Sequence, residues 1–170
     1  LYVSPEALKR RDLVPTLVGG GQEFGFRSGT ENLIGIVGFG AAVKKAHSSL
    51  DESIARMASL REYTLLKLAS LDVRLNVPLA ATAPHIINFT LPSIKSETML
   101  HHLEQDGVYV SSSSACAKGK RSYVLKAIGL SDRLIDSSLR ISFSKYNTKD
   151  DVDAFLTSLK SGIDTLSKFK

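Results

Sequence analysis

Residues Ser111–Ser122 read S-S-S-S-A-C-A-K-G-K-R-S, and the predicted strands and helices are arranged around this cysteine stretch. It contains Cys116, the only cysteine of the 170 residues, followed closely by Lys118, Lys120 and Arg121. Small polar residues bury little apolar surface, which predicts an exposed loop. A thiol reacts as the thiolate, and nearby positive charge favours that form. The pattern indicates a nucleophilic thiol; the alternative is a buried, unreactive cysteine, which is the commoner situation for this residue.

The elements predicted around this stretch define the fold class. From residue 73 onward, hydrophobic periodicity and turn residues predict the order strand, strand, helix, strand, short helix, strand, helix. We expect strands over 73–77, 85–91, 108–110 and 139–143, and helices over 96–105, over 122–128 and after Thr148. Ser96 is expected to cap the first of these helices. This order is typical of an α+β fold, with a small mixed or antiparallel sheet covered by helices.

The first part of the chain has a different pattern. Residues 33–46 and 53–71 have the spacing of two helices, which we expect to form a separate packing group. Asn32 or Thr30 is expected to cap the first helix. Before it, Gly19–Asn32 contains five glycines together with Arg27, Ser28 and Thr30. Exposed amides and these side chains predict contact with a phosphate or carboxylate, although a mobile surface loop explains the glycines equally well.

Composition excludes several classes of function. The net charge is +5, but the 22 basic residues are spread along the chain and there is no tryptophan, so we expect no nucleic-acid binding. No apolar run is long enough to span a bilayer. A single cysteine fits a reducing compartment, and we expect a cytoplasmic protein. His101 and His102 are adjacent on a predicted helix and point apart, so we expect no metal site.

Three stretches resemble one family, the pyridoxal-phosphate-dependent (PLP-dependent) cysteine desulfurases of the class V aminotransferase group. The first is Gly19–Asn32, which reads G-G-G-Q-E-F-G-F-R-S-G-T-E-N. The second is Asn88–Cys116, where N-F-T-L-P and a predicted helix lead into the cysteine stretch. The third comprises Ser122–Leu130, S-Y-V-L-K-A-I-G-L, followed by Ser137–Phe143, S-S-L-R-I-S-F. They occur in the family's order, which makes the resemblance specific.

The resemblance implies roles for three residues. Cys116 matches the cysteine that takes sulfur from PLP-bound L-cysteine, leaving L-alanine and an enzyme persulfide. Arg140 matches the arginine that binds the substrate carboxylate. Thr30 matches the threonine that reaches a PLP phosphate across the interface of a homodimer. The family then passes the sulfur to an acceptor protein, such as a scaffold for iron–sulfur cluster assembly.

The resemblance also implies that the chain is the C-terminal portion of a fold-type I PLP-dependent transferase. We expect residues 1–71 to end the large PLP-binding domain, with connecting helices, and residues 72–170 to form the small domain. The Schiff-base lysine would lie upstream of Leu1-Tyr2-Val3, which reads as the end of a strand. Lys9, Lys44 and Lys45 are not in a matching context, so we expect the 170 residues alone to be inactive.

Two departures from the family pattern and two alternative functions remain. Ser113 stands where the family commonly has glycine. The segment from Cys116 to Tyr123 is slightly shorter than is usual in the long-loop members of the family. Both bear on the reach of the loop and so on the choice of acceptor. The first alternative is a persulfide carrier or interaction domain that works without the cofactor. The second is a related PLP lyase, such as a selenocysteine lyase.

Overall fold

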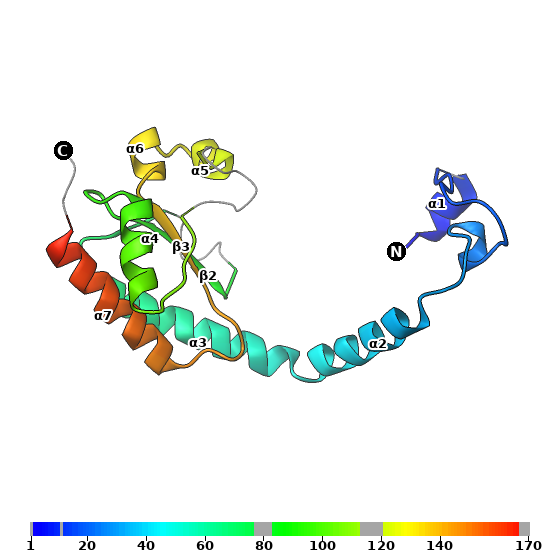
Figure 1. Cartoon of the computed structure of the whole chain (residues 1–170), viewed down its shortest axis with the longest axis horizontal. Helices are drawn as coiled ribbons and strands as arrows, with labels where there is room; N and C mark the ends of the chain where they lie inside the picture. Colours follow the sequence, from blue (N-terminus) through cyan, green and yellow to red (C-terminus); the bar gives the residue numbers. More distant parts are fainter. Residues whose placement is uncertain (1, 11, 77–82, 113–120, 167–170) are drawn as a thin grey trace. The chain divides into compact units, whose positions relative to one another are not determined.

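The computed structural model describes residues 2–10, 12–76, 83–112 and 121–166 (Figure 1). The chain divides into two compact units, residues 1–49 and residues 50–170. The small sheet and the described ends of the cysteine stretch belong to the second unit. The predicted domains 1–71 and 72–170 concern the complete protein and stay a prediction.

The first unit contains two short helices and one long helix. They are α1 (Pro5–Arg10), the 3₁₀ helix η1 (Glu23–Gly25) and α2 (Leu33–Ser48). Asn32 caps α2 as predicted, because its Oδ1 accepts a hydrogen bond from the Gly35 N–H at 3.0 Å. Residues 2 and 3 form no strand, contrary to the expectation for that end of the chain.

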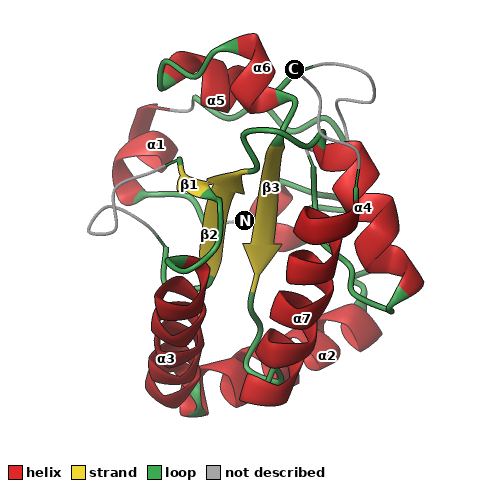
Figure 2. Ribbon diagram, turned by 90° about the vertical axis from the view of Figure 1, so that its left-hand side faces the viewer, coloured by secondary structure: helices red, strands yellow, loops and turns green. Residues whose placement is uncertain are grey.

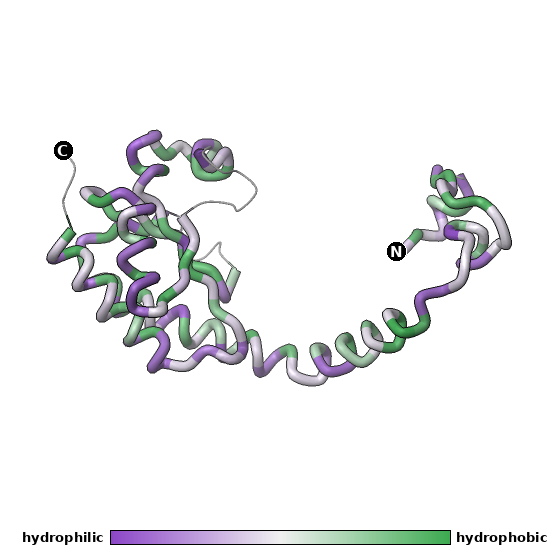
Figure 3. The backbone as a smooth tube through the Cα atoms, viewed as in Figure 1, coloured by the Kyte–Doolittle hydropathy of each residue, from purple (hydrophilic) through white to green (hydrophobic). Residues whose placement is uncertain are grey.

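Helix α2 leaves its apolar side chains exposed within the described chain. None of its residues is buried, and Ile34, Val37 and Phe39 are at least 70% exposed. Figure 3 shows hydrophobic residues concentrated in its N-terminal part, with polar residues towards its end. An apolar surface of this kind marks a site of contact with other protein.

The second unit consists of a three-stranded antiparallel sheet and five helices among the described residues. In chain order these are α3 (Leu50–Leu68), β1 (Arg74–Leu75), β2 (Ile86–Thr90), α4 (Ser96–Gln105), α5 (Tyr123–Ala127), α6 (Asp132–Ile135), β3 (Ser138–Ser142) and α7 (Lys149–Thr165). The strand order is β1-β2-β3. The α+β fold with a small antiparallel sheet is confirmed.

The hydrophobic core lies between one face of the sheet and helices α3, α4 and α7 (Figure 2). Phe89 and Leu139, on neighbouring strands, are fully buried. Phe89 meets Phe155 of α7 edge to face, with 6.5 Å between the ring centres. From the helices come Leu68, Met99, Leu103 and Leu159. This packing fixes β3 and therefore the position of Arg140.

The opposite face of the sheet is polar, because side chains alternate along a strand. Thr90 and Ser138 are buried there, and their hydroxyl groups lie 2.9 Å apart. The Asn76 amide joins them, since its Nδ2 donates to Ser138 at 3.0 Å and its Oδ1 accepts from Thr90 at 2.8 Å. Arg140 lies opposite Asn88 in the β2–β3 register on this same face. Buried hydroxyls and amides that satisfy one another hold the two strands in register.

Three details differ from the sequence prediction. Residues 108–110 form no strand, and only Ser111 makes a bridge, to Arg140. Ser96 is the first residue of α4 rather than its cap, and its hydroxyl donates to the Asp136 carbonyl at 2.8 Å. Helices α2 and α3 belong to different compact units rather than to one separate packing group. Helix α3 packs against α7 within the second unit, and its residues Leu60, Thr64 and Leu68 are buried.

Candidate active site

Arg140 lies on β3 beside the start of the cysteine stretch. Its backbone N–H donates to the Ser111 carbonyl at 2.7 Å, and the Ser111 N–H donates back at 3.1 Å. The Arg140 Nη2 also donates to the Ser111 Oγ at 3.4 Å. The sheet therefore holds Ser111 directly against Arg140, for which the family resemblance implies a substrate-binding role.

The Arg140 guanidinium is exposed and, among the described residues, pairs with no carboxylate. Its register neighbours, Asn88 and the bridge residue Ser111, are uncharged. A guanidinium presents parallel N–H donors that match the two oxygens of a carboxylate. The Arg140 guanidinium is thus available for an anionic ligand, and its role in substrate binding stays a prediction of the family resemblance.

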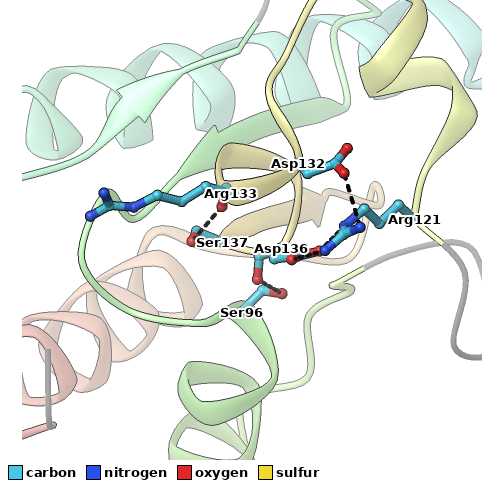
Figure 4. A network of polar contacts seen from close by, with 6 residues as sticks. All are labelled: Ser96, Arg121, Asp132, Arg133, Asp136 and Ser137. Carbon is cyan, nitrogen blue, oxygen red and sulfur yellow. Dashed lines mark hydrogen bonds and ion pairs between the residues drawn. The ribbon is translucent and has the colours of Figure 1, made fainter. Parts of the chain in front are cut away.

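Arg121, near the other end of the cysteine stretch, is paired with carboxylates, in contrast to Arg140. Its Nε and Nη2 donate to the two carboxylate oxygens of Asp136, both at 2.8 Å, and its Nη1 donates to Asp132 at 3.0 Å (Figure 4). The Arg121 guanidinium lowers the pKa of the Asp136 carboxyl, mainly by hydrogen bonding. We call Arg121, Asp132 and Asp136 the ion-pair cluster.

Sequence reasoning missed this cluster. It counted Arg121 among three cations that favour the thiolate, whereas two carboxylates already balance the Arg121 charge. The signal was available, because Asp132 and Asp136 are four residues apart and a helical turn brings such residues to one side. The short helix α6, which was not predicted, provides that turn.

Cys116, the predicted nucleophile, and the cations Lys118 and Lys120 lie outside the described residues. What the structure does describe is both attachment points of the cysteine stretch. Ser111 is held on β3, and Ser122 caps α5 by accepting a hydrogen bond from the Leu125 N–H at 3.3 Å. The role of Cys116 stays a prediction.

Thr30 lies in the glycine-rich loop of the first unit. The Arg27 Nη1 donates to the Gly29 and Thr30 carbonyls at 3.1 and 2.7 Å, which shapes the loop from within. Glu23 and Phe24 have φ of 50° and 56°, a left-handed conformation that costs energy for residues other than glycine. The Thr30 hydroxyl is exposed and makes no hydrogen bond with the described residues. Such a loop has free donors for an anion such as phosphate.

Among the described residues, a cavity lies away from Arg140, and there is no metal site and no membrane-spanning helix. A cavity of about 290 Å³ lies between residues 106–110, β3 and the start of α7, but Arg140 does not line it. No group of three or more His, Cys, Asp or Glu side chains in the described ranges could hold a metal ion. No helix in those ranges is long and apolar enough to cross a membrane.

Comparison with known proteins confirms the resemblance that the three motifs indicated. The chain is 37% identical over 163 residues to the cysteine desulfurase IscS of Dictyoglomus turgidum, and 37% identical over 150 residues to a NifS/IcsS protein homolog of Lactobacillus delbrueckii subsp. bulgaricus. These alignments cover 92% and 86% of the chain but 41% and 39% of the relatives. The chain thus spans about two fifths of the curated relatives it matches.

Solved structures give the same relationship. A NifS-like protein superposes with a TM-score of 0.77 at 35% identity, covering 89% of this chain and 39% of that one. The X-ray structure of a NifS-like protein from Rickettsia africae gives 0.76 at 31% identity, covering 89% and 40%. The family model described as aminotransferase class-V matches residues 1–155. The chain therefore belongs to the class-V aminotransferase family.

Proposed function

We propose that this chain is the C-terminal part of a cysteine desulfurase, which converts L-cysteine to L-alanine and places the sulfur on Cys116. One observation supports the proposal most directly. Arg140, whose guanidinium pairs with no carboxylate among the described residues, is hydrogen-bonded to Ser111 at the start of the cysteine stretch. A site for a small amino-acid carboxylate thus lies next to the segment that carries the nucleophile.

Arg140 would bind and orient the substrate through its carboxylate. The Cys116 thiolate would then attack the substrate sulfur, so that a sulfur–sulfur bond forms as the bond between sulfur and Cβ breaks. The electron pair of the broken bond stays with Cβ, which takes up a proton in place of the one lost from the substrate thiol. The products are L-alanine and the Cys116 persulfide.

PLP would supply the electron sink for this step. In this chain, the Thr30 hydroxyl and the glycine-rich loop are suited to hold its phosphate, in the partner subunit of a homodimer as the resemblance implies. No lysine of the chain stands in the context of the family's Schiff-base lysine, so we propose that the 170 residues alone do not hold PLP. The exposed apolar side chains of α2 support packing of this chain within a larger folded body.

The persulfide would pass to an acceptor protein, for which a scaffold of iron–sulfur cluster assembly is our leading candidate. The test of the proposed function uses the complete enzyme with PLP and L-cysteine. We expect L-alanine to appear and a mass increase of one sulfur atom on the peptide containing Cys116. Persulfide on Cys116 without any L-alanine would instead favour a carrier domain, and L-alanine formed at an undiminished rate by Cys116→Ala would favour a lyase.

A further inference from the structure

The ion-pair cluster attaches Arg121 to the fold through all three of its guanidinium nitrogens. Nε and Nη2 bind both oxygens of Asp136, and Nη1 binds Asp132 (Figure 4). Two parallel hydrogen bonds to one carboxylate fix the direction of the guanidinium as well as its distance. An exposed lysine would hold one point only. The geometry therefore constrains the chain at Arg121 more than an ordinary surface charge would.

Asp136 is itself fixed from the other side. Its backbone carbonyl accepts hydrogen bonds from both the N–H and the Oγ of Ser96, at 2.9 and 2.8 Å (Figure 4). Ser96 is 4% exposed and begins α4, which packs in the core. Arg121 is thus connected through Asp136 to Ser96, a buried residue at the start of α4.

Both ends of the cysteine stretch are attached to the same short segment. Ser111 is hydrogen-bonded to Arg140, and Arg121 is hydrogen-bonded to Asp136. Asp136 and Arg140 are only four residues apart. Cys116 is five residues from Ser111 and five residues from Arg121. A chain of five residues spans at most about 18 Å, so each attachment point limits where the thiol can be. Two fixed ends limit it more than one.

We propose that Arg121 is a positioning residue for sulfur transfer, holding the C-terminal end of the cysteine stretch so that the Cys116 thiol is presented to substrate bound at Arg140. The role is geometric rather than electrostatic, because Asp132 and Asp136 already balance the Arg121 charge. This inference rests on the proposed function, since it concerns delivery of that thiol to that substrate.

A positioning role makes a distinctive prediction for Arg121→Gln in the complete enzyme. Single-turnover formation of the Cys116 persulfide should slow about 10- to 100-fold, because a small misplacement of reacting groups is costly. The apparent Kd for L-cysteine should stay within about twofold, since Arg140 is untouched. Alkylation of Cys116 by iodoacetamide should also stay within about twofold, because a diffusing reagent does not depend on delivery of the thiol to one place.

Lys126→Gln is the matched control. Lys126 is exposed on α5 and also carries one positive charge, but its ammonium makes no ion pair with the described residues. Its single-turnover rate should equal that of the wild type. Arg121→Lys, which keeps the charge and loses the two parallel hydrogen bonds, should lie between the wild type and Arg121→Gln. Equal slowing of Lys126→Gln and Arg121→Gln would assign the effect to charge and overturn the inference.

A double-mutant cycle with Asp136→Asn tests the partner. If Arg121 acts through Asp136, the double variant should be no slower than the slower single variant, whereas independent roles give multiplied effects. Multiplied effects, or a wild-type rate in Arg121→Gln, would overturn the positioning role while leaving the proposed function intact. A wild-type enzyme that forms no persulfide on Cys116 would overturn both. Thermal unfolding and the bound-PLP spectrum of each variant exclude a simple folding defect.

Discussion

Arg140 and Ser111 are joined by two backbone hydrogen bonds of 2.7 and 3.1 Å and by a side-chain contact of 3.4 Å. Ser111 is also where the cysteine stretch leaves the sheet. Arg140, the proposed substrate-binding residue, and the point where the segment carrying Cys116 leaves the sheet are therefore held together directly. In the proposed function, orientation of the substrate and delivery of the thiol would both depend on the position of β3.

Arg140→Lys in the complete enzyme should lower kcat/KM for L-cysteine about 10- to 150-fold. Lysine keeps the charge but loses the paired donors, and a hydrogen bond to a charged group contributes about 1.5–3 kcal/mol. Steady-state kinetics of L-alanine formation measures the change. Arg74→Lys, an exposed arginine on β1, is the control and should leave kcat/KM unchanged. A near wild-type value for Arg140→Lys would assign the carboxylate to another residue.

Cys116→Ala in the complete enzyme should abolish sulfur transfer to an acceptor and leave PLP bound, because the thiol does not hold the cofactor. In the wild type, we expect fast alkylation by iodoacetamide with an apparent pKa below the free-thiol value of about 8.5. The pH dependence of the alkylation rate measures this. If Cys116 reacted only after unfolding, it would be a buried structural residue, and the proposed nucleophile would be wrong.

The 170-residue chain alone should not bind PLP in stoichiometric amount. None of its lysines, including Lys9, Lys44 and Lys45, matches the context of the family's Schiff-base lysine. Adding PLP and recording the absorbance spectrum checks this directly. The prediction fails if a full-strength band of lysine-bound PLP appears and one lysine substitution removes it.

Gly162→Ala should destabilise the packing of α7 on α4. A Cβ at Gly162 would lie 2.6 Å from the Met99 Sδ and 2.8 Å from the His102 Cδ2. We expect a loss of about 1–3 kcal/mol from overpacking, which outweighs the gain of about 1 kcal/mol that alanine brings to a helix. Hydrogen exchange of the α7 amides measures the local free energy of unfolding. Ser161→Ala, at the exposed neighbouring position of α7, should cause no such loss.

Acid should weaken the attachment of α6 to Arg121. The hydrogen bond from Arg121 lowers the pKa of Asp136 in the folded protein, so its stabilising effect is complete above the unfolded value of about 3.9. The effect is lost as the pH falls through the lower, folded pKa. The protection of the α6 amides, measured as their exchange rate relative to the intrinsic rate at each pH, should therefore fall below about pH 4. In Asp136→Asn the fall should be smaller, and an unchanged fall would mean that another carboxylate controls it.

The sequence predicts the elements whose patterns are strong and local. Helix α7 shows the whole signal, with Thr148 and Asp151 forming the capping box that starts an amphipathic run. Asn32 caps helix α2 as expected. The β3 strand places Arg140 on the face opposite the core, as alternation predicts. Alternation gives the face on which Arg140 lies, whereas its candidate role comes from the family resemblance.

The parts that sequence reasoning missed depend on contacts between distant residues. Serine commonly caps helices, but the Ser96 hydroxyl instead donates a hydrogen bond to the carbonyl of Asp136, 40 residues later. Arg121 looks like a free cation until α6 brings two carboxylates to it. Residues 108–110 have the pattern of a strand, yet only Ser111 finds a partner. Local propensity carries no information on such tertiary partners.

Attachment of both Ser111 and Arg121 to the segment from Asp136 to Arg140 has an evolutionary consequence. We expect that the residues between the two attachment points can change in number or identity without altering the sheet or the core, because Ser111 and Arg121 keep their own contacts. Doubling the length of such a loop costs only about 0.6 kcal/mol of closure entropy. The cysteine stretch is therefore the segment whose length and sequence we expect to vary most freely. In the proposed function, selection for a new sulfur acceptor would act on this stretch and leave the proposed L-cysteine contact at Arg140 unchanged.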